Sequence, residues 1–375
     1  METFQKMKPE DLSPRARELN CRSAGVNLHD HLMFEFAIRR ALGETKVFDT
    51  RYLPALRQGG FQTVVTTVGA NSPCTCNLSD HLAFGCFEQI DMLRQEEAEG
   101  ASFRICRNLR DIRAAHEAGK IALILAFEGA RALEGREGEE SLVMLRTFYE
   151  LGLRLNCIAG GARTVFADGV GDIRAAAGLT TFGVKLVEEM NRLGMVIDLA
   201  HMTDRSFFDV MEVTGSPVVV SHVGVQAVCP VDANLSGERI RAIGKNGGLI
   251  GMEIVKTEIQ KGAEETGELV TYDRVVDHID HIADLIGVEH ICLGLDFDNF
   301  PLVHNVFRAM SPAPGSIEGF HTGIPKGDHM LNEPSNVGEA YVISEYLCRR
   351  GYSDKEILGI LGENAYRILE QVLGE

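Results

Sequence analysis

Eight short apolar runs, spread along the whole chain, constrain the fold more than any other feature of the sequence. Each run holds five to eight residues and contains several apolar side chains, many of them β-branched. Near-continuous apolar runs of this length are typical of parallel strands that are buried on both faces. The runs are residues 26–32, 61–68, 121–127, 153–159, 195–200, 217–221, 248–254 and 291–297.

Segments with a helical spacing of apolar residues lie between these runs. Residues 178–194 show this spacing and end in a glycine, which is typical of a helix C-terminus. The same pattern occurs at 204–213, 236–247 and 273–287. Eight alternating strands and helices predict an α/β fold, a (β/α)8 TIM barrel, with an open doubly wound sheet as the alternative.

We expect one decorated barrel over residues 1–375, because no Pro- or Ser-rich linker divides the chain. Loops that follow barrel strands cover the mouth at which barrel enzymes act, so a long segment after the eighth strand is predicted to form a lid. The sequence beyond a minimal barrel comprises an N-terminal lead-in at 1–22, a connection at about 69–120, the predicted lid at 299–336 and C-terminal helices at 337–375.

The charge balance restricts the partners that we expect. Lys and Arg total 37 against 54 Asp and Glu, a formal net charge of −17. Such a chain repels phosphate backbones and anionic lipids, so we predict no nucleic-acid and no membrane partner. No run approaches the roughly 20 apolar residues of a membrane span, and the first residues hold no apolar stretch of signal-peptide length. We therefore expect a cytoplasmic enzyme whose nine cysteines are reduced thiols.

Ionisable residues stand at the ends of five of the eight runs, where barrel enzymes place their chemistry. Residues two apart on a strand share a face, so two histidines spaced in this way can reach one ion. Packing alone does not account for six such residues at five strand ends. They are His29 and His31 after the first run, Glu128 after the third, His201 after the fifth, His222 after the sixth and Asp296 at the end of the eighth.

Four imidazoles and one carboxylate can hold two divalent cations. We predict that His29 and His31 bind one ion and that His201 and His222 bind the other. Glu128 is the natural bridge between the ions, because a carboxylate has two oxygens. Imidazole-rich ligation favours Zn²⁺, with Mn²⁺, Co²⁺ or Fe²⁺ as alternatives.

The predicted chemistry is hydrolysis. A water shared by two cations loses a proton near neutral pH and becomes a nucleophile. Asp296 then suits a general acid/base that takes this proton and delivers it to the leaving amine. The expected substrate is a small molecule with an amide, an ester or a related bond.

Other chemically suggestive residues carry less weight. His278 and His281 lie three apart on a predicted helix, and we interpret them as helix-surface residues because they stand at no strand end. Cys74 and Cys76 lack a second thiolate pair and are interpreted as loop thiols. The glycines at 247–251 precede no phosphate-loop pattern, so nucleotide binding is not predicted.

Three stretches carry a family resemblance. Residues 178–252 contain a strand ending in His, a strand ending in Ser-His, the tripeptide NLS and the segment GGLIG; residues 293–300 read LGLDFDNF and residues 349–369 read RRGYSDKEILGILGENAYRIL. In this order they resemble the membrane (renal) dipeptidases, metallopeptidases of the amidohydrolase superfamily. The resemblance runs from about residue 23 to the end. It implies a (β/α)8 barrel, a binuclear metal centre and a homodimer.

The resemblance also implies roles for individual residues. His29, Glu128, His201 and His222 fall on the family's metal ligands, and Asp296 falls on its catalytic aspartate. His31 stands where the family usually has Asp, and it still supplies a ligand atom.

Two positions depart from the family's pattern. Gly160 stands where the family has a His that contacts the substrate, at the end of the fourth strand. Ala233 stands before Asn234, where the family has an Arg that holds the substrate carboxylate. We predict that Arg163, in the loop after the fourth run, supplies a replacement cation for substrate binding.

Together these features predict a binuclear metal-dependent hydrolase of a peptide bond in a small, dipeptide-like substrate. Because of Gly160 and Ala233, the alternative is the same barrel acting on another amide, such as an N-acyl or modified amino acid or a cyclic amide. A third reading is a relative that binds metal without catalysis. Asp296 disfavours it, since that residue serves chemistry more than folding.

Overall fold

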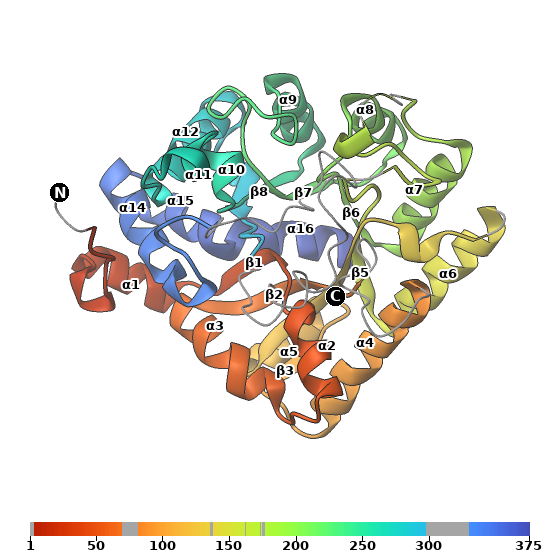
Figure 1. Cartoon of the computed structure of the whole chain (residues 1–375), viewed down its shortest axis with the longest axis horizontal. Helices are drawn as coiled ribbons and strands as arrows, with labels where there is room; N and C mark the ends of the chain where they lie inside the picture. The colour runs from red at the N-terminus through yellow and green to blue at the C-terminus, as the bar shows by residue number, and fades with distance from the viewer. Residues whose placement is uncertain are drawn as a thin grey trace.

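The computed structural model describes residues 4–69, 82–135, 138–161, 163–172, 174, 177–297 and 330–375. Within these residues, nine parallel strands form one sheet that curves into a nearly closed barrel surrounded by helices (Figure 1). Eight strands lie side by side in the order β1-β2-β4-β5-β6-β7-β8-β9. Their bounds are β1 Gly25–Asp30, β2 Phe61–Thr67, β4 Ile121–Glu128, β5 Leu153–Cys157, β6 Val196–Asp198, β7 Val219–Val223, β8 Leu249–Met252 and β9 Ile291–Leu293.

Backbone hydrogen bonds just beyond β9 join the two ends of the sheet. The N–H of Asp296 donates to the carbonyl of His29, and the N–H of His31 donates to the carbonyl of Phe297. The nitrogen–oxygen distance is 3.3 Å in both hydrogen bonds. The strand that begins the sheet therefore lies beside the one that ends it. The predicted (β/α)8 barrel is confirmed, and each of the eight predicted runs overlaps one of its strands.

The ninth strand, β3 (Phe103–Ile105), lies within the region predicted only as a long connection. It pairs with residues 121–123 of β4, ahead of residues 125–128, which pair with β5. The prediction omitted β3 because three residues are too few to give a hydrophobic pattern. The rest of the described connection forms α4 (Leu82–Ala98) and α5 (Leu109–Glu117).

The four helices predicted from the sequence lie close to their predicted bounds. The hydroxyls of Thr180, Thr203 and Ser236 cap three of them by accepting backbone N–H bonds. Gly194 and Gly247 end two of them in the left-handed conformation that glycine adopts without strain. The helices are α7 Thr181–Leu193, α8 Asp204–Val213, α9 Gly237–Asn246 and α12 Tyr272–Ile286, with α1 Pro14–Arg22, α2 Met33–Ala41, α3 Leu53–Gly59, α6 Gly138–Leu151, α10 Lys256–Ile259 and α11 Ala263–Thr266.

The C-terminal helix α16 (Asn364–Leu373) closes one end of the barrel. Ala365, Ile368 and Leu369 pack with interior side chains such as Val26 and Leu249, which lie at the starts of their strands. Asn364 also donates to the carbonyl of Ile291, the first residue of β9. The N-terminal ends of the strands are therefore covered, and the opposite end remains for chemistry. The described C-terminal region also contains α14 Ile343–Arg350 and α15 Asp354–Leu358.

Most of the predicted lid, residues 299–329, lies outside the described residues. The described end of that segment runs beside the exit of β8, where the N–H of Leu331 donates to the carbonyl of Ile254 over 3.1 Å. In the described part of the chain, no helix has both the length and the apolar character needed to cross a membrane.

Candidate metal centre

The two histidines of the first strand bring their ring nitrogens together. His29 lies in β1 and His31 directly follows it, and both side chains are buried. Their Nε2 atoms are 3.3 Å apart. Two ligands of a tetrahedral Zn²⁺, each bound at 2.0–2.1 Å, lie about this far from one another. The pair therefore has a spacing that suits ligands of one cation.

A second pair of imidazoles comes from two different strands. His222 lies in β7 and His201 follows β6, and their Nε2 atoms are 2.8 Å apart. The backbone of His201 has φ 61°, in the left-handed region that non-glycine residues rarely enter. This sharp turn at the end of β6 brings the imidazole toward the other three, and strained backbone of this kind clusters at functional sites.

Glu128 stands between the two pairs. It is the last residue of β4, and its two carboxylate oxygens face different imidazoles. Oε2 is 3.6 Å from Nε2 of His31, and Oε1 is 3.1 Å from Nε2 of His201. The carboxylate therefore has the position that the sequence predicted for a bridging ligand.

Asp296 faces the first pair. Its Oδ1 lies 2.9 Å from Nε2 of His31 and 3.5 Å from Nε2 of His29. Like His201, it has a left-handed backbone, with φ 50°. The hydrogen bond from its N–H to the carbonyl of His29 fixes this turn against β1.

A serine and an aspartate behind the imidazoles determine which nitrogen carries the proton. Ser221 donates its hydroxyl proton to Oδ2 of Asp198, at a distance of 2.5 Å. The Oγ of Ser221 also lies 2.8 Å from Nδ1 of His222. Because that hydroxyl proton is already used, the serine oxygen accepts a proton from Nδ1. The lone pair on Nε2 of His222 is then free to bind a cation.

Thr67 holds His31 in the same tautomer. Its hydroxyl reaches the carbonyl of Asp30 over 3.5 Å, and its oxygen lies 3.0 Å from Nδ1 of His31. The threonine therefore accepts from Nδ1 and leaves the lone pair on Nε2 facing the centre. The sequence analysis did not select Thr67, Ser221 or Asp198. A signal was present, since each is a polar residue within an apolar run.

The proton affinities of these groups reflect their burial and mutual contact. Burial lowers the pKa of His29 to about 3 and lowers that of His222 well below its usual value. Burial would also lower the pKa of His201, but the hydrogen bond with Glu128 outweighs it and raises this pKa to about 9. Burial alone would raise the pKa of Glu128, but the hydrogen bond with the imidazolium of His201 lowers it. The net result is a lowered pKa. The carboxylate is therefore ionised, as a metal ligand must be.

The donor set fits a pair of divalent cations. Three overlapping groups each offer three ligand atoms within 4.8 Å of one another. Nitrogen lone pairs and carboxylate oxygens repel one another at such separations unless protons or cations lie between them. The groups are His29, His222 and Asp296; His29, His31 and Glu128; and Glu128, His201 and His222. The structure thus brings together all six residues selected from the strand ends, and their roles as ligands and catalyst stay predictions.

The predicted substrate-binding residue is placed differently. Arg163 is half-exposed, and its Nε lies 3.1 Å from Oδ1 of the buried Asp168. That carboxylate also accepts backbone N–H groups of Ala177 and Gly178. The ion pair offsets part of the charge that Arg163 can offer to a substrate. Its predicted role in substrate binding stays a prediction.

The interpretation of His278 as a surface residue is wrong. Its side chain is fully buried in α12, and both of its ring nitrogens meet backbone groups. The N–H of Val225 donates to Nδ1 over 2.9 Å, and Nε2 lies 3.1 Å from the carbonyl of Ile259. His281 is partly exposed, as predicted. Cys74 and Cys76 lie outside the described residues.

A further polar residue at a strand end, Glu253, was overlooked. Glu253 directly follows β8 and is only 1% exposed. It belongs to the seventh apolar run, so the rule of weighing ionisable residues at strand ends would have selected it. It was missed because it lies within the apolar run GLIGMEI rather than after it.

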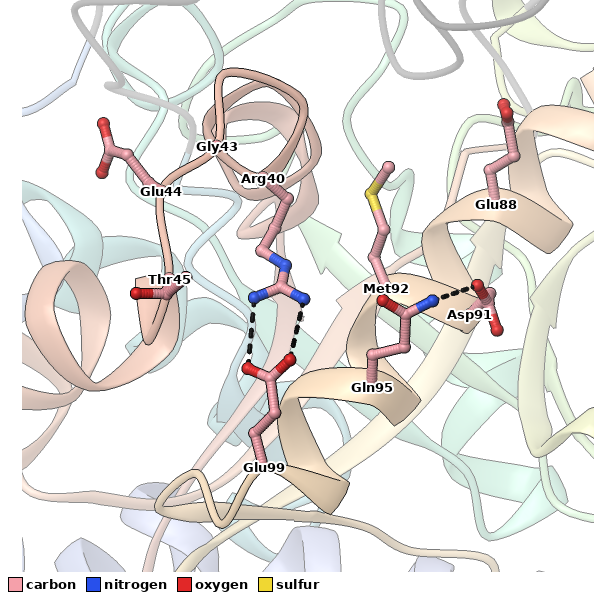
Figure 2. Close-up of a pocket in the computed structure, with 9 residues that line it drawn as sticks. All are labelled: Arg40, Gly43, Glu44, Thr45, Glu88, Asp91, Met92, Gln95 and Glu99. Carbon is pink, nitrogen blue, oxygen red and sulfur yellow. Dashed lines mark hydrogen bonds and ion pairs between the residues drawn. The ribbon is translucent and has the colours of Figure 1, made fainter.

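A separate pocket lies on the surface between the end of α2 and α4 (Figure 2). Its lining is mainly acidic, and Arg40 within it is paired with Glu99 through two bonds of 3.3 Å. Gln95 donates to Asp91 on the same helix. None of the residues that converge at the strand ends lines this pocket. It is therefore distinct from the histidine cluster.

Comparisons with curated proteins give related sequences. Dipeptidase 3 of Homo sapiens is 30% identical over 305 residues, which cover 80% of this chain and 54% of that protein. Dipeptidase 3 of Rattus norvegicus is 29% identical over 290 residues, which cover 76% of this chain and 51% of that protein. The chain thus spans about half the length of these relatives.

Solved structures share the fold. A metallopeptidase from Rhodobacter sphaeroides, bound to a phosphinate mimic of the dipeptide L-Ala-D-Ala, superposes with a TM-score of 0.77 at 21% identity, covering 93% of this chain and 99% of that chain. An amidohydrolase from Pseudomonas aeruginosa gives 0.74 at 23% identity, covering 96% and 99%. At these identities the likeness concerns the fold.

The family assignment rests on sequence. Residues 15–318 match the family model described as membrane dipeptidase, peptidase family M19. That range holds four of the predicted ligand histidines as well as Glu128 and Asp296. The match covers most of the chain, and the human relative agrees with it. This chain belongs to the membrane dipeptidase family, peptidase family M19.

Proposed function

We propose that this chain is a metal-dependent hydrolase that cleaves the amide bond of a small, dipeptide-like substrate. One observation carries the proposal. Four imidazole nitrogens and two carboxylates from five strand ends converge at the open end of the barrel, with neighbouring ligand atoms 2.8–3.6 Å apart. The family match supports peptide hydrolysis, and a relative with the same fold was solved with a dipeptide mimic.

The ligand set supports two bound ions. His29, His31, Glu128, His201 and His222 would hold them, and the imidazole-rich set favours zinc, with manganese, cobalt or iron as alternatives. When bound, such ions polarise the substrate carbonyl and lower the pKa of water, which supplies hydroxide near neutral pH.

Asp296 carries the proton in this proposal. Its carboxylate accepts a proton from the attacking water and delivers it to the leaving nitrogen. A carbon–oxygen bond forms, the carbon–nitrogen bond breaks, and the products are a carboxylate and an amine. Burial alone would raise the pKa of Asp296, but the imidazoles of His222 and His31 lower it well below its usual value. The group is therefore ionised and able to accept a proton at neutral pH.

The alternative is another small amide as substrate, such as an N-acyl or modified amino acid or a cyclic amide. It is supported by the absence of a charged side chain at Gly160 and Ala233, and by the pairing of Arg163 with Asp168. In this reading the metal centre is unchanged and only the binding of the substrate's remaining groups differs.

Metal analysis and a substrate panel test the proposal. Mildly purified protein is expected to carry close to two equivalents of divalent metal, measured by plasma mass spectrometry. The panel contains L,L- and L,D-dipeptides, N-acyl amino acids and cyclic amides, with amine release as the readout. Absence of bound metal after mild purification would contradict every hydrolase reading. Turnover of another amide, with no dipeptide hydrolysed, would favour the alternative.

Assembly and location are also proposed. The family resemblance favours a homodimer, which light scattering after gel filtration would detect as a mass near twice the 41.1 kDa of the chain. A mass of one chain at micromolar concentration would contradict it. The cytoplasmic location expected from the composition stays a prediction.

A further inference from the structure

Glu253 is a buried carboxyl group at the barrel mouth that the proposed reaction does not use. Leu249, at the start of β8, packs in the barrel interior. Side chains alternate along a strand, so Gly251 and Glu253 share that inward side. Glu253 is 1% exposed. Its side chain therefore points into the barrel from the strand beside β9, which Asp296 follows.

One oxygen of this carboxyl group has no partner. Among the described residues, Oε1 of Glu253 makes no hydrogen bond. Its immediate neighbour is a second carboxyl group, Glu258, to which it is hydrogen-bonded. Burial, followed by the charges of Glu258 and Asp296, raises the pKa of Glu253 well above its usual range. A buried polar oxygen without a partner is costly, which points to a ligand that would satisfy it.

The surrounding backbone holds the two glutamates in place. The side chain of Asn234 donates to the carbonyl of Glu258 over 2.7 Å and accepts from the N–H of Gly224 over 2.9 Å. A Cβ on Gly224 would lie 2.7 Å from that same carbonyl, so the segments are in direct contact. The residue that precedes Asn234 is Ala233, which contributes no charge. These contacts fix the backbone of Glu258, and the site is acidic.

The separation from Asp296 limits what the ligand can be. Met252 pairs with Leu293, which sets Glu253 level with Gly294 on the neighbouring strand. Asp296 lies two residues further along, so the two Cα atoms are roughly 8 Å apart, given about 4.8 Å between strands and 3.3 Å per residue. A group bound at Glu253 is thus close to the bond whose proton transfer Asp296 serves.

We propose that Glu253 binds a free ammonium group adjacent to the scissile amide and so selects aminoacyl amides over N-acylated ones. An ammonium nitrogen donates hydrogen bonds to the unpartnered oxygen and offsets the charge of the acid pair. An N-acylated substrate offers a neutral amide in its place, and a carboxylate is repelled. This inference rests on the proposed hydrolase function and chooses between its two substrate classes.

A matched pair of substrates and a matched variant test it. The metal-loaded enzyme and its Glu253→Gln variant are assayed with L-Ala-L-Ala and with N-acetyl-L-Ala-L-Ala. We expect kcat/KM of the parent enzyme to be about 10- to 100-fold higher for the free amine, the range of a charge-assisted hydrogen bond. The variant is expected to lose this preference. Glu268→Gln, which alters an exposed glutamate outside the site, is expected to keep it.

The outcomes separate this inference from the hydrolase proposal. Equal hydrolysis of both peptides by the parent enzyme, or equal loss on both in the variant, overturns the role of Glu253 and leaves the hydrolase intact. A preference for the acetylated peptide also overturns it, because Glu253 would then act as a neutral hydrogen-bond donor. Turnover of neither peptide contradicts dipeptide hydrolysis, and the calorimetric comparison of ligands then decides the role of Glu253.

Binding to proteins that also carry Asp296→Asn, in which turnover is expected to be abolished, tests the inference without hydrolysis of the probe. Calorimetry compares L-alaninamide with propionamide, which differ only in the ammonium group. The parent protein is expected to bind L-alaninamide at least about tenfold more tightly, and Glu253→Gln to bind both alike. Equal affinities in the parent overturn the inference. Thermal unfolding checks that the variant is folded, and Glu253→Asp, which retains the charge, is expected to keep the preference if Glu253→Gln is unstable.

Discussion

The imidazole of His278 and those of the metal centre are similarly buried but are held in opposite ways. Both nitrogens of His278 are used by backbone groups, the N–H of Val225 and the carbonyl of Ile259. In the metal centre, Nδ1 of His31 and of His222 is held by a hydroxyl, while Nε2 faces other ligand atoms. The first arrangement engages both nitrogens with backbone groups, and the second directs Nε2 toward the other nitrogens and carboxylates of the cluster.

Burial and pKa do not separate His278 from His29 of the candidate metal centre. Burial lowers the pKa of His278 to about 4 and that of His29 to about 3. Both are therefore neutral at physiological pH, whatever their role. The difference lies in what the outer nitrogen meets, a carbonyl in one case and further nitrogens and carboxylates in the other. A buried histidine is thus a ligand candidate when one of its nitrogens faces other nitrogens and carboxylates rather than a backbone group.

The largest expected effect comes from removing the carboxylate beside the metal centre. Asp296→Asn keeps the shape of the side chain but cannot accept a proton. We expect turnover to fall by at least about 10³-fold, within the range of general acid–base catalysis, while metal content stays near that of the parent protein. Steady-state kinetics and metal analysis of the same preparations measure both quantities. Retained activity would remove Asp296 from the mechanism.

The second effect concerns stability and pH. The unfolded chain protonates His278 below about pH 6.5, whereas the folded chain does so only near pH 4. The unfolded state therefore binds more protons between these values, and the stability contributed by a neutral His278 is lost as the pH falls through this window. The loss reaches about 3 kcal/mol at pH 4, from the two pKa values and about 1.4 kcal/mol per unit.

Urea unfolding at several pH values measures this effect. His278→Gln can make the same two hydrogen bonds but does not titrate, so its unfolding free energy should fall less steeply between pH 6.5 and pH 4. His281→Gln, a change on the same helix at a partly exposed position, should follow the parent protein. If all three proteins show the same slope, the buried imidazole of α12 does not contribute to the pH dependence.

The smallest expected effect comes from the hydroxyl behind the imidazoles. Ser221→Ala removes the acceptor for Nδ1 of His222 and the donor to Asp198. Loss of such an outer partner typically weakens metal binding by about 10- to 100-fold. Competition with a chelator measures the affinity. Ser216→Ala, just before the same strand, is the control and should bind metal as the parent does. Unchanged affinity in Ser221→Ala would show that Ser221 does not orient the ligand.

Much of this architecture follows from local sequence because the barrel repeats one rule. Every second side chain of a strand points into the barrel, and the last of these at the open end is polar. Glu128 and His222 could therefore be located from the apolar runs that precede them. Convergence on one point could be expected because a closed barrel brings all strand ends together. The same reasoning applied to Glu253 would have found it.

The features that sequence did not reveal depend on distant contacts. His278 was assigned to the helix surface because nothing local shows that the loop after β7 packs over α12 and reaches its ring. The pairing of Arg163 with Asp168 is likewise set by how the loop after β5 folds back on itself. Loop conformations of this kind carry no periodic signal, so the substrate-facing side was less predictable than the metal-facing side.

Because α16 covers the N-terminal ends of the strands, the candidate metal centre lies at the opposite end of the described barrel. In the proposed reaction, metal ions, substrate and products would all use that end. The two ends of the barrel are therefore under different evolutionary constraints. Side chains around Ile368 can be exchanged to tune thermal tolerance with no direct contact with the chemistry, while every change at the opposite rim is exposed to selection on what the enzyme accepts.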